Sequence, residues 1–220
     1  MLKPILLSDL SIFITLAVTS SPIFSLSEDA GSGVAKIQIP SSAPILGSAE
    51  IQIRNKETLE IIANQTQPFV RQSPAFMVSN TPGGGQIVAI NEDGKPNSGG
   101  NPAARGSEIT FKLIGYGQID SAPEDGVAAE WPVFVDGILY IGASTGCGPG
   151  GVLGLCEASV ITSTLDPVTP GVWNIKARIG SGSLVTGTVG VVLIYRSMYS
   201  NYYSLNGQDV RIATTIAVRP

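Results

Sequence analysis

Histidine is absent from the 220-residue chain. This excludes the Ser-His-Asp and Cys-His catalytic arrangements, because both need an imidazole as the base. It also excludes nearly every catalytic zinc site, since those sites use histidine ligands. No run of Lys or Arg occurs and the net charge is −4, so the chain offers no basic stripe to the phosphates of DNA or RNA. The composition predicts a protein that is not an enzyme, holds no cofactor and binds no nucleic acid.

Cysteine is scarce, and the only two cysteines, Cys147 and Cys156, enclose the segment CGPGGVLGLC. The glycines and Pro149 let the chain reverse between them, which favours a disulfide and therefore an oxidising compartment. On the chain-entropy argument, closing such a loop stabilises the fold by roughly 3 kcal/mol. The alternative is two buried free thiols. A zinc site is disfavoured, because neither a histidine nor a third cysteine is present to complete the ligands.

Segments with a clean 3.6-residue hydrophobic period are also missing. Instead, 26 glycines and 15 prolines divide the chain into short alternating segments, a pattern typical of all-β proteins. Strong strands are predicted at residues 108–117, 172–179 and 188–200, and Asp136-Gly137 predicts a hairpin within residues 133–143. About a dozen short strands at this spacing predict an all-β fold of tandem Ig-like sandwich lobes.

The apolar N-terminal segment, residues 1–26, has three competing interpretations. A signal peptide fits Lys3 and the apolar stretch, although Asp9 interrupts that stretch. A strand fits the strict alternation of large aliphatic residues, which is found at Leu10, Ile12, Ile14, Leu16 and Val18. A transmembrane helix fits less well, because Ser, Thr and Pro22 prevent about 18 clean apolar residues from accumulating. The remaining organisation predicted is a linker at 27–33, a first, incomplete Ig-like lobe at 34–78 and a second lobe at 79–220.

From residue 34 to the C-terminus the chain resembles one family, the Solibacter-type C-terminal domain of unknown function found in secreted proteins of acidobacteria. The most specific block is SPAFMVSNTPGGGQIVAINEDGKPNSGGNPAARGSEITFKLIGYGQ, and AKIQIP, GSAEIQIRN, EDGVAAEWPV, PGVWNIKARI and TIAVRP accompany it in the same order. The resemblance implies tandem Ig-like lobes, export and no assigned activity, and it supplies no catalytic residue. The chain differs from the family in lacking most of the usual first strands and in the insertion around Cys147 and Cys156.

Two acidic segments are candidate sites. Asn91, Glu92, Asp93 and Asn97 offer oxygen ligands for Ca²⁺, but the spacing lacks the pattern of an EF-hand and favours a turn at Asp93-Gly94. The second segment contains four carboxylates, those of Asp120, Glu124, Asp125 and Glu130. Paired carboxylates suit glycoside hydrolysis, but no neighbour in the sequence would separate their pKa values. A solvent-exposed connection is therefore favoured for these four residues. No metal site is predicted.

Tyrosines crowd the segment YRSMYSNYY, namely Tyr195, Tyr199, Tyr202 and Tyr203. Exposed tyrosines bind sugars and protein partners, whereas aromatic residues at a sheet edge often serve only packing, and both interpretations stay open. Asn64 begins the sequon Asn-Gln-Thr, a candidate for glycosylation on a presumed turn.

Together these features predict a non-enzymatic extracellular or cell-surface protein that assembles with copies of itself. The first lobe, short of strands, would accept residues 10–18 of a neighbour by β-strand addition, and head-to-tail repetition would give a pilus-like filament. The alternative is a monomeric adhesion module that binds surface glycans or proteins through the tyrosine segment.

Overall fold

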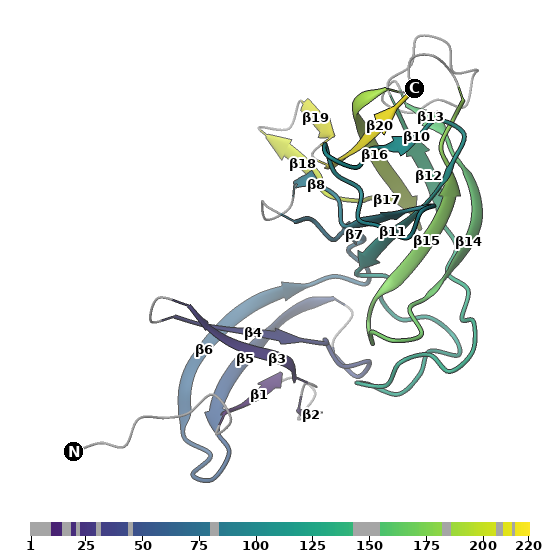
Figure 1. Cartoon of the computed structure of the whole chain (residues 1–220). Helices are drawn as coiled ribbons and strands as arrows, with labels where there is room; N and C mark the ends of the chain where they lie inside the picture. The colour runs from purple at the N-terminus through teal and green to yellow at the C-terminus, as the bar shows by residue number, and fades with distance from the viewer. Residues whose placement is uncertain are drawn as a thin grey trace.

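The computed structural model describes residues 10–14, 19–20, 23–29, 32–43, 46–79, 84–142, 155–181, 186–205, 209–212 and 214–220. These residues form β-strands and no helix, which confirms the all-β prediction. Consequently none of them belongs to a helix that could cross a membrane. The strands make two lobes, a smaller one from β1 to β6 and a larger one from β7 onward (Figure 1).

The smaller lobe contains one four-stranded antiparallel sheet in the order β2-β1-β5-β6 and a separate antiparallel pair, β3 and β4. Its strands are β1 (Leu10–Ile14), β2 (Thr19–Ser20), β3 (Ile23–Asp29), β4 (Ser32–Ile37), β5 (Gly47–Asn55) and β6 (Ile61–Phe69).

The larger lobe contains two main sheets. The first has the order β10-β20-β16-β12-β13, with β17 on β16 and β8 on β20; the second has the order β14-β15-β11-β7, with β9 on β11. Its strands are β7 (Ala75–Phe76), β8 (Gly85–Gln86), β9 (Ala89–Asn91), β10 (Ala103–Ala104), β11 (Glu108–Ile114), β12 (Ile138–Ile141), β13 (Cys156–Glu157), β14 (Ser159–Leu165), β15 (Trp173–Arg178), β16 (Gly187–Tyr195), β17 (Met198–Tyr199), β18 (Tyr202–Leu205), β19 (Asp209–Ile212) and β20 (Thr214–Arg219).

The core of the larger lobe lies between these two sheets. Alternate residues of β11 and β15 in one sheet, and of β12, β16 and β20 in the other, are buried in a single apolar cluster. Trp173 packs edge-on against Tyr195, with ring centroids 5.2 Å apart, and so joins the two sheets. Two facing sheets with an alternating interior are compatible with an Ig-like sandwich.

The hairpin predicted at Asp136-Gly137 is wrong. Residues 133–135 pair with β14 in one sheet, since Val135 N donates to Ser163 O at 3.1 Å, whereas β12 pairs with β16 in the other sheet. The chain therefore crosses between the sheets at Gly137. A Cβ there would lie 3.0 Å from Leu193 and 3.2 Å from Trp173, so the crossing needs a residue without a side chain.

The long strand predicted at residues 188–200 is wrong at its C-terminal end. β16 stops at Tyr195, and the chain reverses through Arg196 and Ser197, which have φ angles of 47° and 65°. β17 then pairs back on β16, with Met198 opposite Tyr195. A two-residue turn with both φ angles positive matches the twist of a hairpin, although Asn-Gly is its usual sequence.

The two main sheets of the larger lobe leave little strand edge open. Its terminal strands β7, β10 and β13 are two residues long each. The longer edge strand, β14, is covered by residues 133–135, because Leu165 N donates to Val133 O at 2.9 Å and Phe134 bridges to Thr164. Short or covered edges are a common defence against pairing with other chains.

Hydrogen bonds connect the two lobes. The carboxylate of Asp125 accepts from the Ser41 backbone N–H at 2.9 Å and 3.0 Å, and Gly126 N donates to the Gln38 side chain at 2.9 Å. The connection after β6 also lies close to the larger lobe, where Ser73 N donates to Gly115 O at 2.9 Å.

Asp166 is the best-satisfied carboxylate of the larger lobe. It is 4% exposed and forms a 2.8 Å ion pair with Lys112. Burial raises the pKa of Asp166, but hydrogen bonds from Lys112, from the backbone N–H groups of Val168 and Thr169, and from Asn174 outweigh it and lower the pKa to about 2. Asp166 therefore fixes the turn between β14 and β15 in its ionised form.

Candidate functional site

The hairpin of β5 and β6 presents a long, exposed strand edge. β6 is nine residues long and pairs with β5 along one side, and no other described strand pairs with its second side. Residues 61–66 are all exposed, with Ile61 at 47% and Ile62 at 43%. An edge of this length presents unpaired backbone N–H and C=O groups to another chain.

β5 explains why this hairpin forms, since its two faces differ. One face carries Ala49, Ile51 and Ile53, which alternate as expected for a half-buried strand. The other face carries a ladder of polar side chains: Gln52 Nε2 donates to Glu50 Oε2 at 2.9 Å, and Arg54 Nε donates to Gln52 Oε1 at 2.8 Å. The polar face is thus hydrogen-bonded within the strand, although Gln52 is only 5% exposed.

The turn between β5 and β6 is fixed by Asn55. Its side-chain oxygen accepts from the N–H groups of Glu57 at 2.8 Å and Thr58 at 3.0 Å, and its own N–H donates to Glu60 O at 3.0 Å. Leu59 completes the turn with a positive φ of 59° and is 58% exposed. A left-handed leucine costs free energy that glycine or asparagine would not.

Of the predicted assembly strand, the described part is β1. It pairs antiparallel with β5 of its own chain, with Leu10 opposite Asn55, Ile12 opposite Ile53 and Ile14 opposite Ile51. The register therefore aligns aliphatic positions of the two strands. Leu16 and Val18 lie outside the described residues. In the single chain, β1 completes the sheet of its own lobe.

Asn64 lies in the middle of β6 rather than on the presumed turn. Asn64 is exposed, and its side-chain amide donates to Glu50 of the neighbouring strand. Glycosylation there stays a prediction, and a glycan at this position would project from the face of the sheet that carries Glu50.

Of the predicted tyrosine surface, one member is buried. Tyr195 is 2% exposed in the core, its pKa is raised by burial, and the Arg196 guanidinium lies 5.0 Å from the centre of its ring. It therefore belongs to the core and not to a contact surface. Tyr199 is 38% exposed on the short β17. The side chains of Tyr202 and Tyr203 lie outside the described part.

The predicted disulfide is not tested, because Cys147 lies outside the described residues. Cys156 begins β13, is half-buried and pairs in register with Ile141 of β12. The disulfide stays a prediction.

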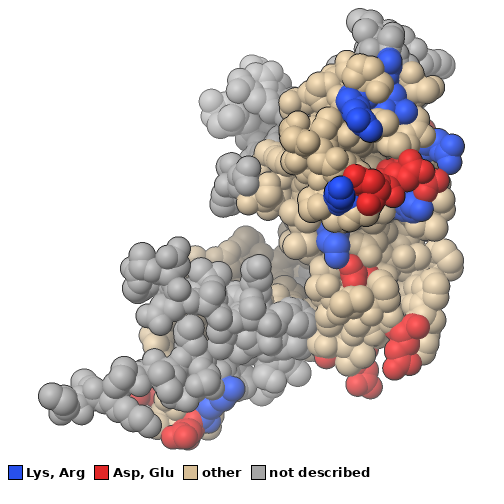
Figure 2. Space-filling view, viewed as in Figure 1, with Lys and Arg blue, Asp and Glu red and all other residues tan. Residues whose placement is uncertain are grey.

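The acidic connection does not bring carboxylates together as a site. Asp120, Glu124 and Glu130 are exposed, whereas Asp125 is occupied by its bonds to Ser41. Within the described residues, no three acidic or cysteine side chains are close enough to hold a metal ion. On the face in Figure 2, acidic and basic side chains form small separate groups amid uncharged surface.

The candidate calcium segment, residues 91–97, forms a turn whose polar groups are hydrogen-bonded within the protein. Asp93 accepts from Lys95 N at 2.9 Å, and Gly94 has a φ of +76°. Asn97 is 5% exposed, donates to Asn91 Oδ1 at 2.9 Å and to Ala217 O at 2.8 Å, and accepts from Ala217 N at 2.8 Å. Its side chain therefore pairs with β20 as a backbone group would.

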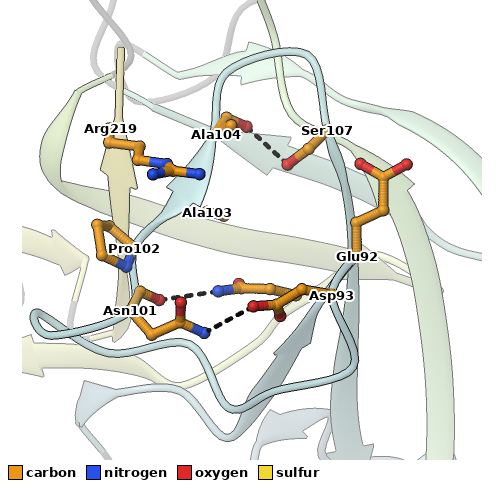
Figure 3. Close-up of a pocket in the computed structure, with 9 residues that line it drawn as sticks. Glu92, Asp93, Asn101, Pro102, Ala103, Ala104, Ser107 and Arg219 are labelled. Carbon is orange, nitrogen blue, oxygen red and sulfur yellow. Dashed lines mark hydrogen bonds between the residues drawn. The ribbon is translucent and has the colours of Figure 1, made fainter.

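A pocket of about 290 Å³ lies beside this turn, next to β10 and the end of β20 (Figure 3). Asn101 Nδ2 donates to Asp93 at 3.4 Å, and Asn101 O accepts from Asn91 at 2.8 Å. Because each of these amides bonds to another group of the pocket wall, the Asn91 amide to a backbone carbonyl and the Asn101 amide to a carboxylate, their arrangement serves the fold.

No family model matches the chain, and no match was found among curated proteins or solved structures.

Proposed function

We propose that this protein is a non-enzymatic structural subunit of the extracellular space or cell surface that assembles with copies of itself. In the filament or pilus-like fibre that we envisage, residues 10–18 of one copy take the place of β1 beside β5 of its neighbour. The contact is β-strand donation, and the partner is a second copy of the chain.

The pairing of β1 with β5 is the observation that carries this proposal. Ile12 faces Ile53 and Ile14 faces Ile51 in the register of the two strands. Every copy carries the same segment, so a neighbour's residues 10–14 offer β5 the identical register. Exchange of an identical element between copies is a low-cost route to assembly, and head-to-tail exchange gives an open filament.

Two features of the sequence support an extracellular location. The predicted disulfide between Cys147 and Cys156 requires an oxidising compartment, and the resemblance to the Solibacter-type domain implies export. Labelling of the denatured, non-reduced protein with a thiol reagent tests the first feature. No added mass is expected, and labelling of both cysteines would refute the disulfide.

The test of strand donation is Ile14→Asp in the full chain, followed by light scattering. A charge beside Ile51 should abolish polymers and leave the larger lobe folded, because the larger lobe shares no sheet with β1. Ile39→Asp is the matched control, since Ile39 is 46% exposed outside the sheets. Polymers that persist in Ile14→Asp, or a wild-type chain that is monomeric at every concentration, would overturn the proposal.

A second candidate is a monomeric adhesion module for glycans or surface proteins. It is favoured by two aromatic side chains on one short segment of the larger lobe, Trp131 at 63% and Phe134 at 75% exposed. Exposed aromatic rings stack on sugars and dominate many protein contacts. Under this alternative, Trp131→Ala removes binding on a glycan array while the wild type remains monomeric.

A further inference from the structure

We propose that the open edge of β6 pairs antiparallel with β6 of a second copy, across a two-fold axis at Gln65. This inference rests on the proposed self-assembly and adds a contact that does not use residues 10–18. The surface is defined as the edge formed by residues 61–69.

The exposure of this edge is the first argument. Among the described strands that end the three larger sheets, β6 is the only one that is both long and uncovered, because the others are two residues long or, like β14, are covered. Natural proteins protect such edges with charged residues, bulges or covering loops. No charged residue occurs between Glu60 and Arg71, and the two features that limit pairing, a register irregularity beside Ile61 and Pro68, lie toward the two ends of the strand.

The residues of β6 are complementary to themselves in reverse order, which is the second argument. An antiparallel pair around a two-fold axis places a central residue opposite its own copy, and Gln65 is the midpoint of Ile61–Phe69. In this register Ile61 lies opposite Phe69 of the partner subunit, and Asn64 lies opposite the partner's Thr66. Pairs of aromatic and β-branched residues, and pairs of polar residues, stabilise antiparallel strands.

Charge at the ends of the strand supports the same direction of pairing. Glu60 precedes β6 and Arg71 follows it shortly, and both residues are exposed. Antiparallel pairing brings Glu60 within one residue of the partner's Arg71, whereas parallel pairing would align like charges. The contact therefore has matching apolar, polar and charged positions without a second kind of partner.

The test is disulfide trapping in the full chain. With Gln65→Cys, the two introduced thiols face each other at the axis, where opposite residues are about 4.5–5.5 Å apart, so mild oxidation should give a covalent dimer on a non-reducing gel. Gln67→Cys is the matched control from the same strand and face. Its two copies would lie about 13 Å apart along the strand, and its dimer should form at least about tenfold more slowly. Equal trapping of both variants would overturn the register.

Gln65→Lys supplies a second measurement, because two ammonium groups would then oppose each other at the axis. The dissociation constant of the dimer, from sedimentation, should rise about fivefold, whereas Gln65→Thr should leave it unchanged within about twofold. Repeating the trapping in Ile14→Asp separates the two contacts. A Gln65→Cys dimer that forms in this background supports β6 pairing even if strand donation fails. If the wild-type chain forms polymers but the Gln65→Cys variant gives no covalent dimer, the β6 pairing is wrong and strand donation is unaffected.

Discussion

The two lobes end their sheets in opposite ways. In the two main sheets of the larger lobe, the end strands are two residues long or are covered as residues 133–135 cover β14. In the smaller lobe, β6 runs for nine residues with its outer side exposed. Backbone N–H and C=O groups at the long edge of the larger lobe's second sheet are paired within the lobe, whereas those on the outer side of β6 remain available to another chain. From this contrast we propose that the larger lobe provides stability and the smaller one association.

The two lobes also differ in how far their described side chains are buried. Both sheets of the larger lobe contribute to one dry cluster that includes Trp173, Phe111 and Leu193, each fully buried. In the smaller lobe, β5 buries Ala49 and Gln52, and its isoleucines are only half-buried. A strand with so little buried apolar surface gains more from a neighbour than strands that are already packed.

The largest expected effect is that of Trp173→Ala. Trp173 is fully buried, contacts Tyr195 across the sandwich and donates from Nε1 to Ser163 at 2.8 Å. Its loss should reduce the free energy of unfolding of the larger lobe by about 4 kcal/mol in chemical denaturation. Trp131→Ala, at an exposed position, should cost less than about 0.5 kcal/mol. Similar costs for the two variants would remove the contrast between core and surface.

Asn97→Ala should have the next largest effect. The substitution leaves the N–H and C=O of Ala217 without their partner in a buried position, which should cost about 3 kcal/mol. The control is Asn64→Ala in the smaller lobe, where the amide is exposed and a cost under about 1 kcal/mol is expected. Denaturation followed by near-ultraviolet dichroism measures both. A small cost for Asn97→Ala would show that water replaces its bonds.

Acid should weaken the larger lobe through Asp166. Its pKa is about 2 in the folded protein against 3.8 ordinarily, so the unfolded chain takes up the proton first. The stabilisation is complete above about pH 4 and should be lost as the pH falls from 3.8 toward 2, with a total of about 2 kcal/mol. The dependence of the unfolding free energy on pH across this range should become weaker in Asp166→Asn. It should stay unchanged in Asp120→Asn, an exposed control. An unchanged acid dependence in Asp166→Asn would contradict this assignment.

The smallest expected effect is a gain, from Leu59→Gly in the smaller lobe. Glycine adopts the φ of 59° without strain, but it loses more conformational entropy on folding than leucine does. The expected net effect is a stabilisation of about 0.5 kcal/mol. Hydrogen exchange of β5 and β6 should slow about twofold, while β11 stays the same. Leu46→Gly is the control, since Leu46 is exposed without a positive φ and should not stabilise. Equal effects of both variants would exclude strain at Leu59.

The alternation of apolar residues predicted the strands of the core well. The segment 108–117 contains β11 and the segment 172–179 contains β15, because burial on one face imposes a period of two. Local signals failed where a distant sheet decides the path. Asp136-Gly137 has the sequence of a hairpin turn, but residues on its two sides pair with different sheets. Arg196-Ser197 carries no signal for two positive φ angles, yet it makes a turn.

The candidate site was visible only in part. Alternation at Leu10, Ile12 and Ile14 predicted a strand, and β1 is one, but the sequence did not say which strand it would pair with. The open edge of β6 was missed, since strand order depends on contacts between distant segments. A signal was present in the absence of charge between Glu60 and Arg71, which is unusual for an exposed edge.

The most direct test of the division between the lobes is amide hydrogen exchange of the intact chain at low and high protein concentration. Self-assembly through the smaller lobe predicts that exchange in residues 61–69 slows as the concentration rises, while exchange in β14 does not change. Exchange in residues 61–69 that is independent of concentration, or slowing confined to β14, would contradict the account.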